Sequence, residues 1–117
     1  MQIPQHKHSL THEAKETFAF LKEYNPEAMN GFIQFIHGIE KKGVLSEKFK
    51  QLITVALAVN KQCKFCIAYH TRKALEKGAS KDELLETCLT ASLMGGGPSM
   101  MYIRYVIKEI ELWEKVA

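Results

Sequence analysis

Two cysteines and one histidine lie close together near the middle of the chain, in the pattern Cys63-x-x-Cys66-x-x-x-His70. If this segment is helical, residues three and four apart are neighbours, so all three side chains share one helix face. The two cysteines could then form a disulfide, whose Cα atoms must lie about 4.4–6.8 Å apart. The imidazole of His70 could exchange a proton with the Cys66 thiol. The spacing therefore indicates either redox chemistry or a metal site.

The roles of the two cysteines follow from their places on the helix, and two arguments compete. His70 is one turn from Cys66 but about 10.5 Å along the axis from Cys63, at a rise of about 1.5 Å per residue. This favours Cys66 as the attacking thiol and Cys63 as the resolving thiol. Cys63 lies nearer the start of the helix, where unpaired N–H groups favour a thiolate, so the opposite assignment stays open.

Zinc is an alternative for the same residues. A closed structural site needs four ligands, and the pattern supplies three, with Cys88 or His37 as a possible fourth. No second Cys-x-x-Cys is present. Cys88 stands alone on an apolar helix face, and we interpret it as a buried core residue. We expect no cofactor and no bound metal, and we interpret the histidines His6, His8 and His12 as solvated rather than metal-binding.

The composition is that of an ordinary globular protein, with 46% apolar and 25% charged residues among 117. This length predicts one domain, at residues 11–117, after a flexible N-terminal arm at residues 1–10. The net charge of +3 is too small to indicate nucleic acid or a membrane surface as a partner. Without a signal-like apolar segment we expect a cytoplasmic protein, where a Cys-x-x-Cys pair is more often catalytic or metal-binding than a stable disulfide.

Apolar spacing and capping signals predict an all-α fold, a compact array of about six helices. The N-cap signals are Thr11, Asn25, Ser46 and Ser80, the last in a capping box with Glu83. The stop signals are glycines at 43, 78 and 95–97. The expected helices cover approximately residues 11–24, 26–42, 46–60, 63–77, 80–94 and the chain from 99 onward. Met101, Tyr102 and Tyr105 widen the apolar face of the last helix and indicate subunit contacts.

The central stretch resembles a known family. The residues that carry the resemblance are Leu45-Ser46, Leu52-Ile53, Ala56-x-Ala58, Cys63-x-x-Cys66-x-x-x-His70, Ala74, Gly78-Ala79 and Gly95-Gly96-Gly97-Pro98. Together they are similar to the carboxymuconolactone decarboxylase superfamily, over about half of the chain. The cysteine pair resembles its alkylhydroperoxidase D-like (AhpD-like) branch. Decarboxylase members lack that pair, so decarboxylation is not implied for this chain.

The resemblance implies an all-α fold that assembles as homotrimers or homohexamers. It also implies a thiol-dependent peroxidase or disulfide reductase of antioxidant defence. Cys63 and Cys66 would cycle between dithiol and disulfide, and His70 would relay protons to Cys66. The implied partners are a peroxide or disulfide substrate and an external dithiol protein as reductant. The alternative is a binding or metal-binding protein that keeps the fold with reduced or no catalytic activity.

Two positions depart from the pattern of this branch. The relay of the branch usually starts from a glutamate where this chain has Gln51, and an amide cannot accept a proton near neutral pH. The branch can also carry a histidine where this chain has Phe65. Glu47 lies one helical turn before Gln51, and we hypothesise that it replaces the missing carboxylate. The simpler interpretation of Glu47 is a solvated residue in the first helical turn.

Overall fold

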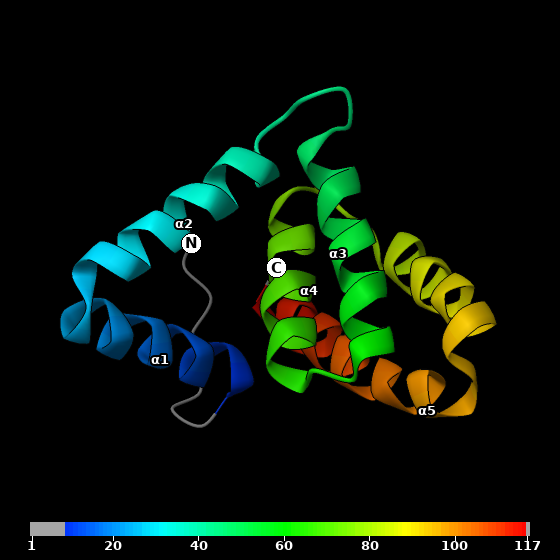
Figure 1. The fold of residues 1–117 in the computed structure, drawn as a ribbon. Coiled ribbons are helices and arrows are strands. Elements are labelled where there is room, and N and C mark those ends of the chain that lie inside the picture. The colour runs from blue at the N-terminus through cyan, green and yellow to red at the C-terminus, as the bar shows by residue number, and fades with distance from the viewer. Residues whose placement is uncertain (1–8, 117) are drawn as a thin grey trace.

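The computed structural model describes residues 9–116, which form helices and, within that range, no strand. The helices are α1 (Leu10–Tyr24), α2 (Pro26–Glu40), α3 (Glu47–Lys61), α4 (Lys64–Glu76) and α5 (Lys81–Val116) (Figure 1). The predicted all-α fold is confirmed. No helix in the described part of the chain is both long and apolar enough to cross a membrane.

The described residues form five helices where about six were predicted, because α5 contains a kink at the glycine segment that joins two helices. α5 continues through Gly95-Gly96-Gly97-Pro98, and only Gly96 has non-helical angles, with φ 69° and ψ −159°. Figure 1 shows the two parts of α5 running in different directions from this bend. The φ of Gly96 favours glycine. At Gly95, a Cβ atom would overlap the side chains of Ser99 and Asn60, so the bend packs too closely for any larger residue.

Most predicted helix starts are confirmed by hydrogen bonds. The side chains of Asn25 and Ser46 accept bonds from backbone N–H groups of the first turns of α2 and α3. Ser80 and Glu83 form the predicted capping box, each side chain bonding the other's backbone N–H.

The first helix start is different from the prediction. Ser9 is the N-cap of α1, and Thr11 lies inside the helix with 2% of its surface exposed. The Thr11 hydroxyl donates a hydrogen bond to the Glu109 carboxylate on α5. Thr11 thus makes a tertiary contact, although its local sequence resembles that of an N-cap. The predicted flexible arm lies largely outside the described residues, but Leu10 belongs to α1.

Helices α3, α4 and α5 contact one another and form what we call the body. Apolar side chains without any exposed surface meet there: Val55, Val59, Ile67, Ala74, Leu84, Cys88 and Val106. Removing such side chains from water supplies about 1.5–3 kcal/mol each for the larger ones. The body is therefore the stable platform of the molecule.

Helices α1 and α2 form a hairpin that lies to one side of the body (Figure 1). In this hairpin, α1 rests on α4, while α2 touches α3 at few points. α2 has the predicted amphipathic spacing, yet none of its residues is buried. It ends at Glu40, before the predicted stop at Gly43. The apolar face of α2 is thus free to line an open space against the body.

Candidate active site

The predicted disulfide is present between Cys63 and Cys66, whose Cα atoms lie 5.3 Å apart. Cys63 is the N-cap of α4, and its sulfur accepts a hydrogen bond of 3.3 Å from the backbone N–H of Cys66. Both sulfurs therefore lie at the positive end of the helix dipole, as the sequence predicted. Negative charge on sulfur is favoured there, which lowers thiol pKa values in reduced proteins.

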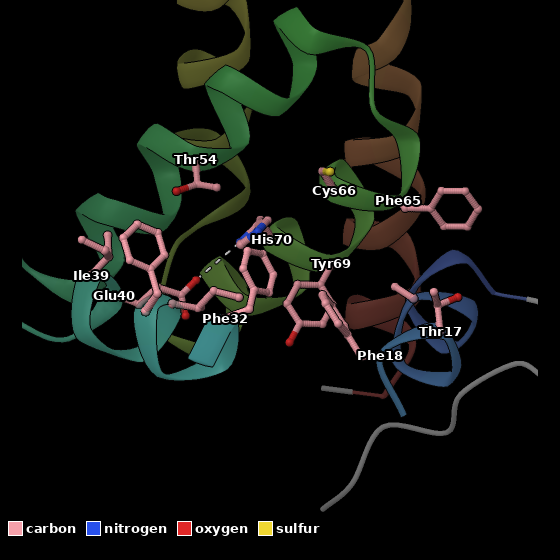
Figure 2. Close-up of a pocket in the computed structure, with 13 residues that line it drawn as sticks. Thr17, Phe18, Phe32, Ile39, Glu40, Thr54, Phe65, Cys66, Tyr69 and His70 are labelled. Carbon is pink, nitrogen blue, oxygen red and sulfur yellow. Dashed lines mark ion pairs between the residues drawn. The ribbon is translucent and has the colours of Figure 1, made fainter. Parts of the chain in front are cut away.

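An apolar cavity of about 550 Å³ opens beside Cys66. Its walls come from both the hairpin and the body, and most of the side chains are aromatic or aliphatic (Figure 2). They include Phe18, Phe32, Phe35, Ile36, Ile39, Phe65 and Tyr69, joined by Glu40, Thr54, Cys66 and His70. Phe65, which departs from the family pattern, thus adds a ring to this wall.

The cavity treats the two cysteines differently. Cys66 lines it and is exposed, whereas Cys63 is half-buried and is not part of the lining. A molecule in the cavity can therefore reach the sulfur of Cys66 first. This geometry supports Cys66 as the attacking thiol, although the hydrogen bond to the Cys63 sulfur still favours a thiolate at Cys63.

His70 lies on the same face of α4 as Cys66, and its ring contacts Gln51 on α3. The distance from His70 Nδ1 to Gln51 Oε1 is 2.9 Å, and Gln51 has only 2% of its surface exposed. An amide oxygen can only accept a hydrogen bond, so this contact requires the proton on Nδ1. The Nε2 atom of neutral His70 then remains free to accept a proton. Gln51, which stands where the family pattern has a glutamate, thus contacts His70 directly through its amide.

A carboxylate that the sequence did not indicate completes this cluster. Glu40, the last residue of α2, places Oε2 at 3.8 Å from His70 Nδ1 (dashed in Figure 2) and hydrogen-bonds the Gln51 side chain. Lys73 Nζ lies 2.8 Å from Glu40 Oε1. At the end of an amphipathic helix, a glutamate resembles any solvated residue, so the sequence contained no signal for this role.

The surroundings of His70 and Glu40 lower the pKa of both groups, which favours a neutral histidine and a charged carboxylate. Burial lowers the pKa of His70, and the positive charge of Lys73 adds to this, while Glu40 works in the opposite direction. Burial alone would raise the pKa of Glu40, but hydrogen bonds from Lys73 and Gln51 outweigh it and lower the value. At neutral pH, His70 is therefore predominantly neutral and Glu40 is charged. A neutral histidine can take a proton from a thiol.

Glu47, the predicted replacement carboxylate, has a different partner. Its Oε1 lies 2.9 Å from Lys77 Nζ, and the side chain is 41% exposed. The bond to Lys77 lowers the pKa of Glu47. The structure therefore places Glu40, rather than Glu47, next to His70 and Gln51, because the end of α2 folds back over this face of the body.

The alternative of a zinc site has no closed ligand set in the part of the chain that the structure describes. Among residues 9–116, no three histidine, cysteine or acidic side chains are grouped closely enough to hold a metal ion. Cys88 is fully buried in the core, and burial raises the pKa of its thiol to about 11. His37 is exposed on α2, and His12 lies 3.5 Å from Glu16. His6 and His8 lie outside the described residues.

Comparisons with known proteins give a consistent result. The model of the carboxymuconolactone decarboxylase family matches residues 26–109. A Legionella pneumophila member of that family, solved in its apo form, is 39% identical, with a TM-score of 0.83 over 87% of this chain and 91% of that one. A Cupriavidus necator protein is 38% identical over 90 residues, which are 77% of this chain and 80% of that protein. A Thermotoga maritima family member, with a suggested role in an antioxidative response, shares the fold at 22% identity, with a TM-score of 0.71 over 85% of this chain and 91% of that one.

Proposed function

Because the chain belongs to the carboxymuconolactone decarboxylase family, we propose that it is an AhpD-like, thiol-dependent oxidoreductase that reduces peroxides or disulfides. The observation that carries the proposal is the cavity in which Cys66 and His70 lie together, with Cys63 joined to Cys66. A reactive cysteine pair needs an accessible sulfur, a partner sulfur and a group that moves protons, and these three residues supply them. The antioxidative role suggested for the Thermotoga protein agrees with this activity.

The peroxidase cycle can be written from these residues. His70 takes the Cys66 proton at Nε2, and the thiolate attacks one peroxide oxygen. An S–O bond forms as the O–O bond breaks, and the alcohol leaves with the proton from His70. The Cys63 thiol then attacks the sulfur of the resulting sulfenic acid. The disulfide bond forms as the S–O bond breaks, and the leaving hydroxide takes the Cys63 proton and departs as water. An external dithiol protein then reduces the disulfide by exchange and is itself oxidised.

The disulfide reductase cycle uses the same groups. The Cys66 thiolate attacks a substrate disulfide, and one substrate sulfur leaves as a thiol. Cys63 then attacks the mixed disulfide at the Cys66 sulfur, which releases the second substrate thiol and restores the Cys63–Cys66 bond. The same end state arises in both cycles, so they differ only in what enters the cavity.

A binding protein on the same fold is the second candidate. The size and apolar lining of the cavity suit a small hydrophobic ligand, since such sites are concave, mostly apolar and about 300–1,000 Å³ in volume. The amide at Gln51 favours this candidate, because it cannot accept a proton as the usual glutamate does. Near-stoichiometric zinc in the purified protein would instead favour the metal-binding form of this alternative.

Counting thiols tests the redox proposal. Reduced protein treated with cumene hydroperoxide or hydrogen peroxide should lose two thiols per chain, and a small dithiol should restore both. Cys63→Ser should accumulate a sulfenic acid, whereas Cys66→Ser should not react. Cys88→Ala, which removes the buried thiol, should lose the same two thiols as the wild type. The absence of a Cys63–Cys66 disulfide after peroxide treatment would exclude this cycle, and capture of a mixed disulfide only through Cys63 would reverse the assignment.

We also propose that the chain assembles as a homotrimer or homohexamer. The unburied apolar face of α2 supports this, as do exposed apolar side chains elsewhere, such as Leu57 at 60% and Leu93 at 84%. Apolar surface of this kind commonly marks contacts between proteins. Sedimentation velocity should show a single species of three or six chains, and a monomer at micromolar concentration would contradict the proposal.

A further inference from the structure

We propose that Glu40 is a positioning residue for the redox cycle, which acts through the Gln51 amide to fix the tautomer of His70 and to strengthen it as a base. This rests on the proposed function of Cys66 and His70. The carboxylate that the family pattern expects at position 51 is then supplied from another helix, by the end of α2.

The orientation of the amide is the first step. The Gln51 side chain contacts two groups, His70 Nδ1 at 2.9 Å and the Glu40 carboxylate. An ionised carboxylate can only accept hydrogen bonds, so the NH₂ group of the amide must face Glu40. Its oxygen must then face His70, which places the ring proton on Nδ1. Without Glu40, the amide could rotate by half a turn, and its NH₂ group would then require the proton on Nε2.

The second step is the charge that forms during the reaction. When His70 accepts the Cys66 proton, it becomes an imidazolium inside a largely apolar cavity. The Glu40 carboxylate, 3.8 Å from Nδ1, stabilises that charge, since an opposite charge within about 4–6 Å favours the ionised form. Glu40 therefore makes proton transfer from the thiol more favourable without touching the substrate.

The third step is that Glu40 is held in place. Lys73 on α4 binds its other oxygen at 2.8 Å, and the carboxyl side chain is only 19% exposed. The backbone around it is fixed as well, because Lys50 Nζ donates to the carbonyls of Ile39 at 2.7 Å and Lys41 at 2.8 Å. These contacts join the end of α2 to α3 and α4, and such support is what a preorganised site requires.

The charged and titratable groups around His70 come from several elements. α2 contributes Glu40, and α4 contributes Lys73 and the ring of Tyr69. α3 contributes the neutral Gln51, and Thr17 and Phe18 are among the uncharged residues that α1 places in the cavity wall. Glu47 and Lys77 form an ion pair farther out. Replacing Glu40 by glutamine thus leaves Lys73 as the charge that acts on His70, and it opposes the imidazolium.

The thiol pKa of Cys66 tests the proposal directly. In the Cys63→Ser background, the rate of iodoacetamide alkylation against pH reports this value, because Cys88 is buried with a pKa of about 11. Glu40→Gln should raise the pKa of the Cys66 thiol by about one unit, because the His70 imidazolium that stabilises the thiolate loses its opposite charge. The matched control is Glu83→Gln, which also breaks an ion pair between helices, at 3.0 Å from Lys48, but lies outside the cavity. An equal profile for the two variants would overturn the proposal.

The His70 tautomer and a rescue variant exclude a purely structural role. Ring ¹⁵N chemical shifts, assigned with His70→Gln, should show the proton on Nδ1 in the wild type and a mixture of tautomers in Glu40→Gln. The double variant Glu40→Gln/Gln51→Glu places a carboxylate directly at Nδ1, and should return the thiol pKa to within about half a unit of the wild type. If Glu40→Gln unfolds at the same temperature as Glu83→Gln but Gln51→Glu gives no rescue, the proposal is wrong.

These readouts are independent of the proposed function. If the protein fails to reduce any peroxide or disulfide while the thiol pKa still depends on Glu40, the redox function fails and the positioning role remains. If turnover is observed and Glu40→Gln leaves both the thiol pKa and the tautomer unchanged, the positioning role fails and the function remains.

Discussion

The body and the hairpin of this protein are stabilised by different kinds of interaction. In the body, α3, α4 and α5 bury a continuous apolar core. In the hairpin, Thr11 is the only buried residue of α1, and α2 has none. The hairpin is attached instead by individual contacts: the Thr11–Glu109 hydrogen bond, the Glu40–Lys73 ion pair, the bonds of Lys50 and the edge contact of the Phe18 and Tyr69 rings.

This difference separates the reactive groups from their surroundings. The cysteines, His70 and Gln51 belong to the body, so packing fixes their mutual geometry. The wall of the cavity and the nearest carboxylate belong largely to the hairpin. Changes in the body should therefore affect folding first, whereas changes in the hairpin should affect the reactivity and accessibility of Cys66.

The largest expected effect comes from a cavity in the body. Leu84→Ala removes a fully buried side chain and should lower the free energy of unfolding by about 2–5 kcal/mol. In the hairpin, Phe35 is 65% exposed, and Phe35→Ala should change stability by no more than about 0.5 kcal/mol, since exposed side chains contribute little. Urea unfolding followed by circular dichroism measures both. Equal losses would show that the hairpin is as well packed as the body, for example through contacts between subunits.

A smaller effect is expected where the two regions meet, at Glu109. Burial raises the pKa of this carboxyl group, and the hydrogen bond from Thr11 and the charge of Arg72 offset this only in part. A raised pKa in the folded state means that the group stabilises the fold relatively more when protonated. This contribution is complete below the unfolded pKa of about 4.5 and is lost as the pH rises through the folded value.

Glu109→Gln removes this titration while it keeps an oxygen for Thr11. The free energy of unfolding of the variant, relative to that of the wild type, should therefore be higher at pH 7 than at pH 4. Urea unfolding at both pH values measures this difference. A difference that is the same at both pH values would mean that Glu109 titrates normally in the folded protein.

The smallest effect is expected for Glu47, outside the cavity. Glu47→Gln breaks a partly exposed ion pair with Lys77 and removes no contact with His70. We expect it to shift the thiol pKa of Cys66 much less than Glu40→Gln does, in the same alkylation assay. A shift as large as that of Glu40→Gln would restore the relay role that the sequence predicted for Glu47.

Local sequence rules were sufficient for the elements that carry the reactive groups. Cys66 and His70 share a helix face because of their spacing, and Cys63 caps the start of that helix. The caps at Asn25, Ser46 and Ser80 follow from side chains that bond nearby N–H groups. The glycine segment was predicted to separate two helices, and the helical geometry does break there, at Gly96, although α5 spans both parts. Thr11 was misread because its partner, Glu109, lies near the other end of the chain.

The sequence by itself thus determined that this protein is all-helical, that it resembles the carboxymuconolactone decarboxylase family, and that two cysteines can join next to a histidine. Only the tertiary structure decided which carboxylate lies next to that histidine and which sulfur faces a cavity. The reason is physical: helical spacing acts over three or four residues, whereas Glu40 reaches Gln51 and His70 only because the hairpin folds back on the body. When a charged residue is brought to a site by packing between distant segments, no spacing pattern in the sequence indicates it.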